Sequence, residues 1–206
     1  MPIGLLLTNI FLLSTVASFG QTLVKEKYPG GELRAEGSVM NDKKEGEWIF
    51  YYPTGKKNSI EHYKNGVLHG KVIYFYPSET KQGIESWKEG AMQDSAWYFY
   101  SNGRLERKGL FENSQYAGTW NYFFENGNPK RIVSYKNGLP DGPIKVYNEN
   151  GFVLQEGNYL KGVEDGEWKF YTEEGQLKFY GSYHAGKETG IWYEIKKGQK
   201  KVYKKY

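Results

Sequence analysis

The segment Gly166-Glu-Trp-Lys-Phe-Tyr-Thr-Glu-Glu-Gly175, continued by Gln-Leu-Lys-Phe-Tyr-Gly-Ser-Tyr183, decides the fold because variants of it recur along the chain. Its first glycine occupies a position that recurs every 24 residues, and we call the residue at this position the marker of its repeat. An aromatic residue lies 17 residues after each of the first six markers. A fixed period without insertions is typical of a repeat protein. The markers are Gly46, Gly70, Asp94, Gly118, Gly142, Gly166 and Gly190. The aromatic residues are Tyr63, Trp87, Phe111, Tyr135, Tyr159 and Tyr183.

Each repeat contains two short runs that are rich in aromatic and β-branched residues, which favours strands. Pairs such as Asn65-Gly66 and Asn102-Gly103 separate the runs and supply the positive φ angles of tight hairpin turns. Gly or Pro interrupts nearly every window that is long enough for a helix. The sequence therefore predicts an all-β fold, an elongated antiparallel β-meander of about seven 24-residue β-hairpin repeats with about fourteen strands.

The period also divides the chain. We interpret residues 1–20 as a signal peptide, 21–45 as an N-terminal capping half-repeat, 46–189 as six full repeats, and 190–206 as a truncated last repeat with a basic tail. Atypical terminal units are common in repeat proteins because they cover the ends of the stack. We number the repeats from Gly46, so that repeat five begins at Gly142.

The N-terminal residues predict the compartment. Ile3 to Phe19 are almost all apolar or small, and the first 24 residues contain no charged side chain. Small residues before Gln21 fit a cleavage site, so we expect a protein that is secreted or periplasmic after cleavage near Gly20/Gln21. The alternative is a single N-terminal membrane anchor. The chain has no cysteine, which excludes disulfide bonds and a lipid-modified cysteine.

The pattern Gly-x-Trp-x-Phe-Tyr, then Gly, then Tyr-x-x-Gly resembles the MORN repeat, in particular its bacterial variant. The resemblance extends over about residues 31–203, and Gly66-Val-Leu-His69-Gly70 is a partial match to the familiar form of the repeat. Proteins similar to this one serve as scaffolds or lipid-associated modules, or are labelled antitoxin components of toxin-antitoxin systems. The resemblance therefore implies binding and names no ligand.

Catalytic and metal-binding patterns are weak. His62, His69 and His184 have neither the spacing of a metal site nor that of a base beside a nucleophile. Carboxylates recur beside the marker, as at Glu45 and Asp165, and we interpret them as solvated surface groups. We expect no enzyme activity, no metal ion and no cofactor.

The positive charge is concentrated at the C-terminus, where residues 196–206 contain six of the 28 basic residues and no acidic one. This basic tail is a candidate binding segment for anionic lipid or an acidic polymer. The alternative is that its lysines keep an open sheet edge from pairing with another chain. The expected secretion argues against a nucleic-acid partner. The tail lysines are Lys196, Lys197, Lys200, Lys201, Lys204 and Lys205.

The sixth position after the marker is aromatic in repeats one to four and polar in repeats five to seven. Strand alternation places this position on the same face as Trp48 and Trp120. Exposed aromatic side chains offer a large contact area at low entropic cost, so we expect these residues to form a binding surface. The alternative is that they are buried. The residues at the sixth position are Tyr52, Tyr76, Tyr100 and Phe124, followed by Asn148, Thr172 and Lys196.

The fifth position after the marker is apolar or aromatic to the end of the chain and points to the opposite face. We therefore expect it to form the core. Its residues are Tyr51, Phe75, Phe99, Phe123, Tyr147, Tyr171 and Ile195.

Together these features predict a secreted, non-enzymatic scaffold of MORN-like repeats that binds a protein partner through an aromatic face. One alternative is a cell-wall, glycan-binding or lipid-binding module, whose ligand would be an envelope glycan or an anionic lipid. Another alternative is an antitoxin-like neutralising protein. The sequence does not identify the partner.

Overall fold

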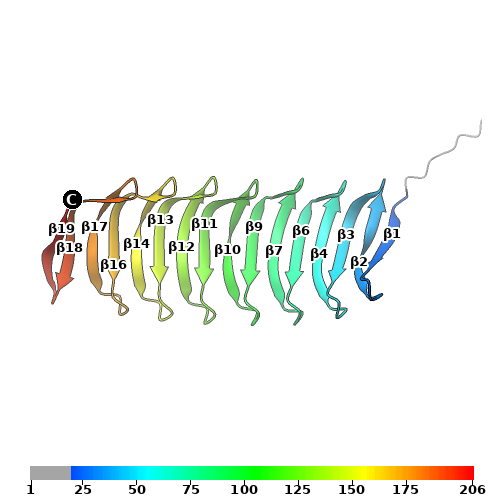
Figure 1. The fold of residues 1–206 in the computed structure, drawn as a ribbon, viewed down its shortest axis with the longest axis horizontal. Coiled ribbons are helices and arrows are strands. Elements are labelled where there is room, and N and C mark those ends of the chain that lie inside the picture. Colours follow the sequence, from blue (N-terminus) through cyan, green and yellow to red (C-terminus); the bar gives the residue numbers. More distant parts are fainter. Residues whose placement is uncertain (1–19) are drawn as a thin grey trace, which may run out of the picture.

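A computed structural model describes residues 20–206, which form one continuous antiparallel sheet of 19 strands (Figure 1). The strands pair in sequence order, and β4, β7 and β14 also pair with β6, β9 and β16 beyond the two-residue strands between them. The sheet therefore runs from β1 at one end to β19 at the other. The predicted all-β meander of hairpin repeats is confirmed. The signal peptide proposed for residues 1–20 lies outside the described residues, apart from Gly20. Among residues 20–206, no helix is long and apolar enough to span a membrane.

The strands follow the period, two to each repeat. They are β1 (Thr22–Lys27), β2 (Leu33–Met40), β3 (Lys43–Tyr51), β4 (Lys57–Lys64), β5 (Val67–Leu68), β6 (Gly70–Phe75), β7 (Lys81–Lys88), β8 (Ala91–Met92), β9 (Asp94–Phe99), β10 (Leu105–Glu112), β11 (Gln115–Phe123), β12 (Pro129–Lys136), β13 (Leu139–Tyr147), β14 (Val153–Leu160), β15 (Val163–Glu164), β16 (Gly166–Tyr171), β17 (Leu177–His184), β18 (Lys187–Lys196) and β19 (Gln199–Lys205).

The sheet contains more strands than the expected number for two reasons. First, β1 and β2 already form a hairpin before the first marker. Second, the marker residue has a positive φ angle, such as 107° at Gly70 and 73° at Asp94. All seven markers have such an angle, which bulges the strand, and in three of the seven repeats β5, β8 and β15 remain as separate two-residue segments. Glycine adopts such an angle without steric cost, which explains its recurrence at the marker.

The core includes Ala35, Phe111 and Val133, and most of it is one column of side chains at the second position after the marker. The residues of this column line one side of the sheet, which we call the aromatic face. Their exposed fractions are 1% for Trp48, 0% for Val72, 1% for Ala96, 0% for Trp120, 5% for Ile144, 3% for Trp168 and 4% for Trp192.

The prediction that the fifth position forms the core is wrong. From Tyr51 to Ile195, the residues at this position are half-buried, and strand alternation places them on the side opposite the tryptophans. Residues 20–206 form a single sheet in which no second layer covers either side, so a side chain is buried only where its own neighbours cover it.

The tryptophans are buried because each ring lies over a glycine on the preceding strand. A Cβ atom at Gly157 would lie 2.2 Å from the ring of Trp168, so a side chain at this position would occupy the space of the ring. The four pairs are Trp48 with Gly37, Trp120 with Gly109, Trp168 with Gly157, and Trp192 with Gly181.

Repeats without tryptophan have a larger residue in place of this glycine, which lies eleven residues before the tryptophan. A small residue on one strand is therefore matched by a large one on the preceding strand. Close packing requires such compensation because voids and overlaps both destabilise a core. The three pairs are Val72 with Glu61, Ala96 with Glu85, and Ile144 with Val133.

Candidate functional site

The tyrosines predicted to form a binding surface join neighbouring repeats. The Tyr76 hydroxyl donates a hydrogen bond to the carbonyl oxygen of Phe99 at 2.8 Å, and Tyr52 and Tyr100 donate to the equivalent carbonyl of the repeat that follows each. All three rings are half-buried at the start of a turn, and burial raises the pKa of Tyr76 and Tyr100. Phe124 has no hydroxyl to continue this series. The sixth position thus has a structural role, and its binding role stays a prediction.

Trp48 and Trp120 do not belong to a binding surface, and this part of the prediction is corrected. Their exposed fractions are 1% and 0% because each ring is covered by its neighbours and lies over a glycine. The indole nitrogens donate hydrogen bonds of 2.9 Å to the carbonyl oxygens of Ser38 and Leu110. Both tryptophans are structural residues of the core.

Four residues of alternating type form a row across the centre of the aromatic face. The register pairs Tyr98 with Arg107, Arg107 with Tyr122, and Tyr122 with Arg131. Arg107 stacks on Tyr98 and Arg131 stacks on Tyr122, each with its Cζ atom 4.3 Å from the ring centroid. The Nε atom of Arg107 is buried and has no hydrogen-bond partner among residues 20–206. We call these four residues the Tyr–Arg row.

The Tyr–Arg row ends at a hollow with a volume of about 470 Å³. Ile144 and Val146 line it, at the positions where repeat four has Trp120 and Tyr122. Smaller side chains at two successive core positions leave this space open. Tyr122 and Arg131 line the hollow from the row. Of the residues predicted from the sequence, Tyr100 also lines it.

Two glutamates replace the core glycine in repeats one and two. Glu85 is only 8% exposed and accepts hydrogen bonds from the Tyr98 hydroxyl at 2.7 Å and from Trp87 Nε1 at 3.0 Å. Glu61 accepts hydrogen bonds from the hydroxyls of Tyr63 and Ser59. Burial and these carboxylates raise the pKa of the surrounding phenols, which are Tyr63, Tyr74 and Tyr98.

Sequence reasoning missed both of these glutamates. Their signature is present in the sequence. The position nine residues before the marker is glycine at 37, 109, 157 and 181, and glutamate at 61 and 85. This replacement of glycine by glutamate identifies a core position only when the strand register is known.

A polar arrangement recurs on the opposite side of the sheet, five repeats apart. Glu36 accepts a hydrogen bond from the Tyr51 hydroxyl at 2.7 Å and pairs with Lys25 Nζ at 3.2 Å. The hydrogen bond from Tyr51, followed by that from Lys25, lowers the pKa of Glu36, and the same contact raises the pKa of Tyr51 to about 12. The equivalent residues are Lys145, Glu156 and Tyr171.

The basic tail lies at one edge of the sheet. Within residues 20–206, β19 pairs with β18 and with no other strand. The tail lysines are exposed, and Lys200 Nζ lies 3.6 Å from the ring centroid of Tyr193. An edge strand rich in lysine fits the protective role considered above. Binding of lipid or an acidic polymer stays a prediction.

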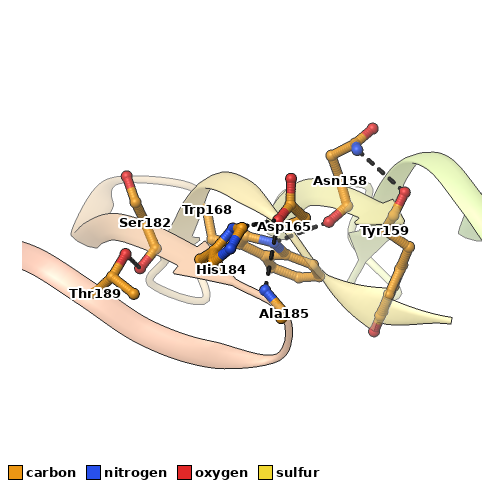
Figure 2. Close-up of polar contacts among 8 residues, drawn as sticks. All are labelled: Asn158, Tyr159, Asp165, Trp168, Ser182, His184, Ala185 and Thr189. Carbon is orange, nitrogen blue, oxygen red and sulfur yellow. Dashed lines mark hydrogen bonds and ion pairs between the residues drawn. The ribbon is translucent and has the colours of Figure 1, made fainter. Parts of the chain in front are cut away.

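Side chains just before the marker hold a turn of the neighbouring hairpin. Figure 2 shows Asp165, whose Oδ1 accepts a hydrogen bond from the backbone nitrogen of Ala185 at 3.5 Å and lies 3.2 Å from His184 Nδ1. Glu45 accepts an equivalent bond from the backbone nitrogen of Asn65 at 2.8 Å. These carboxylates therefore stabilise turns, a role that our sequence interpretation missed. In the described part of the chain, no group of three or more His, Asp or Glu side chains is placed to hold a metal ion.

Comparisons with known proteins give one family match. The model of the MORN repeat variant matches residues 44–65, 117–137 and 164–185. No curated protein matches the chain. The crystal structure of TcdB2-TccC3 is 12% identical with a TM-score of 0.19 over 85% of this chain, which spans 13% of that chain. A protein of unknown function from Bacteroides fragilis is 10% identical with a TM-score of 0.12 over 90% of this chain and 91% of that chain. Such low TM-scores carry no argument about function.

Proposed function

The chain is a MORN-repeat protein, and we propose that it is a secreted, non-enzymatic scaffold that binds a protein partner through its aromatic face. The observation that carries the proposal is the Tyr–Arg row with the adjoining hollow. Tyrosine and arginine are enriched at protein interfaces, where they dominate the binding free energy. Secretion rests on the apolar residues before Gln21.

The build of the sheet supports a protein as the partner. The tyrosines at the sixth position tie repeats one, two and three to the repeat that follows each, so that repeats one to four present a continuous preorganised surface. Preorganisation lowers the entropic cost of association. A sheet of 19 strands offers room for an extended interface.

The test begins with purified residues 21–206 as bait in an extract of the host envelope. Each protein recovered is then purified and titrated against the bait by calorimetry. We expect a 1:1 complex that is weakened about tenfold or more when Tyr52, Tyr76 and Tyr100 are all changed to Ser, because the ring surface is lost. The matched control changes the same three residues to Phe, which removes the hydroxyls and keeps the rings.

Two outcomes would contradict the proposed function. One is a glycan or lipid as the ligand recovered by the bait. The other is a partner that loses affinity on substitution of Tyr51 and Tyr171, which lie on the opposite side of the sheet. Secretion is tested separately, by sequencing the N-terminus of the protein isolated from the host, which is expected to begin at or near Gln21.

A further inference from the structure

The hollow in repeat five has an apolar floor of limited size. Ile144 and Val146 line it, and its volume of about 470 Å³ lies within the range of ligand pockets in proteins. The fourth position after the marker holds an aromatic ring in repeats one to four and in repeat six, such as Tyr122, whereas repeat five has Val146 there. The floor can therefore accept one or two aliphatic side chains from outside.

The wall of the hollow carries a guanidinium group in a fixed position. Arg131 stacks on Tyr122, which holds its plane and leaves the edge with its N–H donors available. The six ion pairs formed among residues 20–206 do not include Arg131. Lys130 also lines the hollow, and its Nζ lies 5.5 Å from the Phe124 ring centroid. A preoriented guanidinium binds carboxylates through paired N–H···O hydrogen bonds.

One acidic group also lines the hollow. Glu106 lies on β10 beside β9, the strand that leads to Tyr100, whereas Arg131 lies on β12, with β11 between the two. Glu106 opposes an anion on its own side and favours one beside Arg131. The charges thus define an orientation for a ligand, with its carboxylate at the row and its apolar part over Ile144 and Val146.

We infer that the hollow binds an acidic side chain flanked by aliphatic residues on an extended segment of the protein partner. This inference rests on the proposed function, because it names the chemistry of the partner at the same face. The carboxylate pairs with Arg131, and the neighbouring aliphatic side chain packs on the floor. Charge complementarity selects an acidic segment over a neutral one of equal shape.

The test uses two synthetic peptides with blocked ends, Gly-Ser-Leu-Glu-Leu-Ser-Gly and its counterpart with Gln in place of Glu. Binding to residues 21–206 is measured by nuclear magnetic resonance titration at low and high salt. The Glu peptide is expected to bind about tenfold tighter than the Gln peptide at low salt, since charged hydrogen bonds are stronger than neutral ones. The preference should shrink as salt is added.

Two variants locate the site. Val146→Tyr installs the residue that repeat four has at this position, so it fills the hollow with a side chain that the fold already accommodates. Arg131→Gln removes the cation and keeps a side chain of similar length. Each is expected to weaken binding of the Glu peptide about tenfold. Arg34→Gln is the matched control, because Arg34 lies in β2, pairs with Glu26 and belongs neither to the Tyr–Arg row nor to the lining of the hollow. Thermal unfolding of every variant verifies that it is folded.

The outcomes separate this inference from the proposed function. Equal affinity for the two peptides overturns the inference, as does unchanged binding by folded Val146→Tyr protein. A partner from the envelope extract that binds wild type and both variants equally also overturns it and leaves the proposed function standing. If no protein partner is recovered, the proposed function fails, and the peptide comparison still decides whether the hollow selects a carboxylate.

Discussion

Two regions of the sheet lack tryptophan in the core, and they fill the resulting space in different ways. In repeats one to three, Val72 and Ala96 are accompanied by Glu61 and Glu85, whose carboxylates are hydrogen-bonded by tyrosine, serine and tryptophan donors. In repeat five, Ile144 is accompanied by another aliphatic residue, and a hollow remains. The first region is a closed polar network, and the second is an open apolar site. The same loss of a ring thus produces either internal structure or a place for a ligand.

The largest effect is expected where the tryptophan remains. Gly157→Ala would place a Cβ atom 2.2 Å from the ring of Trp168, and we expect it to lower the free energy of unfolding by about 3 kcal/mol. Urea denaturation gives this value. Gly83→Ala is the control from the polar region, where the nearest atom of Tyr98 would lie at 3.2 Å and the cost should stay below about 1 kcal/mol. Equal losses would show that the ring does not require the glycine.

The next prediction converts the open region into a closed one. Val133→Gly alone leaves a void, and Ile144→Trp alone overfills the core, so we expect each to lower the free energy of unfolding by about 2 kcal/mol. The double variant recreates the tryptophan–glycine pair and should recover at least half of the summed loss, which a double-mutant cycle measures. Simple additivity of the two changes would refute the proposed compensation between strands.

A smaller effect is expected in the polar region. Glu85→Gln keeps the shape of the side chain but turns one acceptor into a donor that faces either the Tyr98 hydroxyl or Trp87 Nε1. We expect a loss of about 1 to 2 kcal/mol in the free energy of unfolding. The control is Glu106→Gln at the rim of the hollow, which should change it by less than about 0.5 kcal/mol. A neutral effect at Glu85 would mean that the carboxylate network does not stabilise the region.

The last prediction concerns the buried tyrosines, whose effect on stability should change only at alkaline pH. Burial and the nearby carboxylates raise the pKa of Tyr63, Tyr74 and Tyr98, so the folded state retains the neutral phenols. Their contribution to stability is present below the unfolded pKa of about 10 and is lost as the pH rises above it. Alkaline titration followed by tyrosinate absorbance and tryptophan fluorescence should show ionisation coupled to unfolding. Ionisation of all tyrosines near pH 10 without unfolding would contradict this expectation.

The sequence predicted the architecture well because the ends of the strands depend on local residue patterns. The glycine period and the Asn-Gly turns determine where each strand ends, and the match to the repeat family rests on the same residues. The core face was predicted wrongly because Trp48, Val72 and Ala96 differ so much in size that their column did not resemble a core. Their sizes are compensated across the strand pair, and a single strand cannot show this.

The candidate site was harder to predict than the fold. Tyr100 was identified from the sequence and lines the hollow, but Arg131 and Val146 were not identified. Both are informative only through their neighbours, since Arg131 is held by Tyr122 and Val146 matters because it is smaller than the equivalent tyrosine. A bulge between the fourth and fifth positions ends the strict alternation of side chains between the two faces. Tyr52, at the sixth position, therefore lies in a turn beside a carbonyl group and not on the face of the strand.

Because the strands pair in sequence order, the sheet lengthens by the same amount with every repeat. Each 24-residue unit adds two strands, which lengthens the sheet by about 9.6 Å at the usual strand spacing of about 4.8 Å. Glu85 and Val133 occupy equivalent positions in repeats two and four, and they are therefore two such steps apart. Insertion or deletion of one unit would shift these two places relative to each other by a fixed increment and leave the interior of each intact.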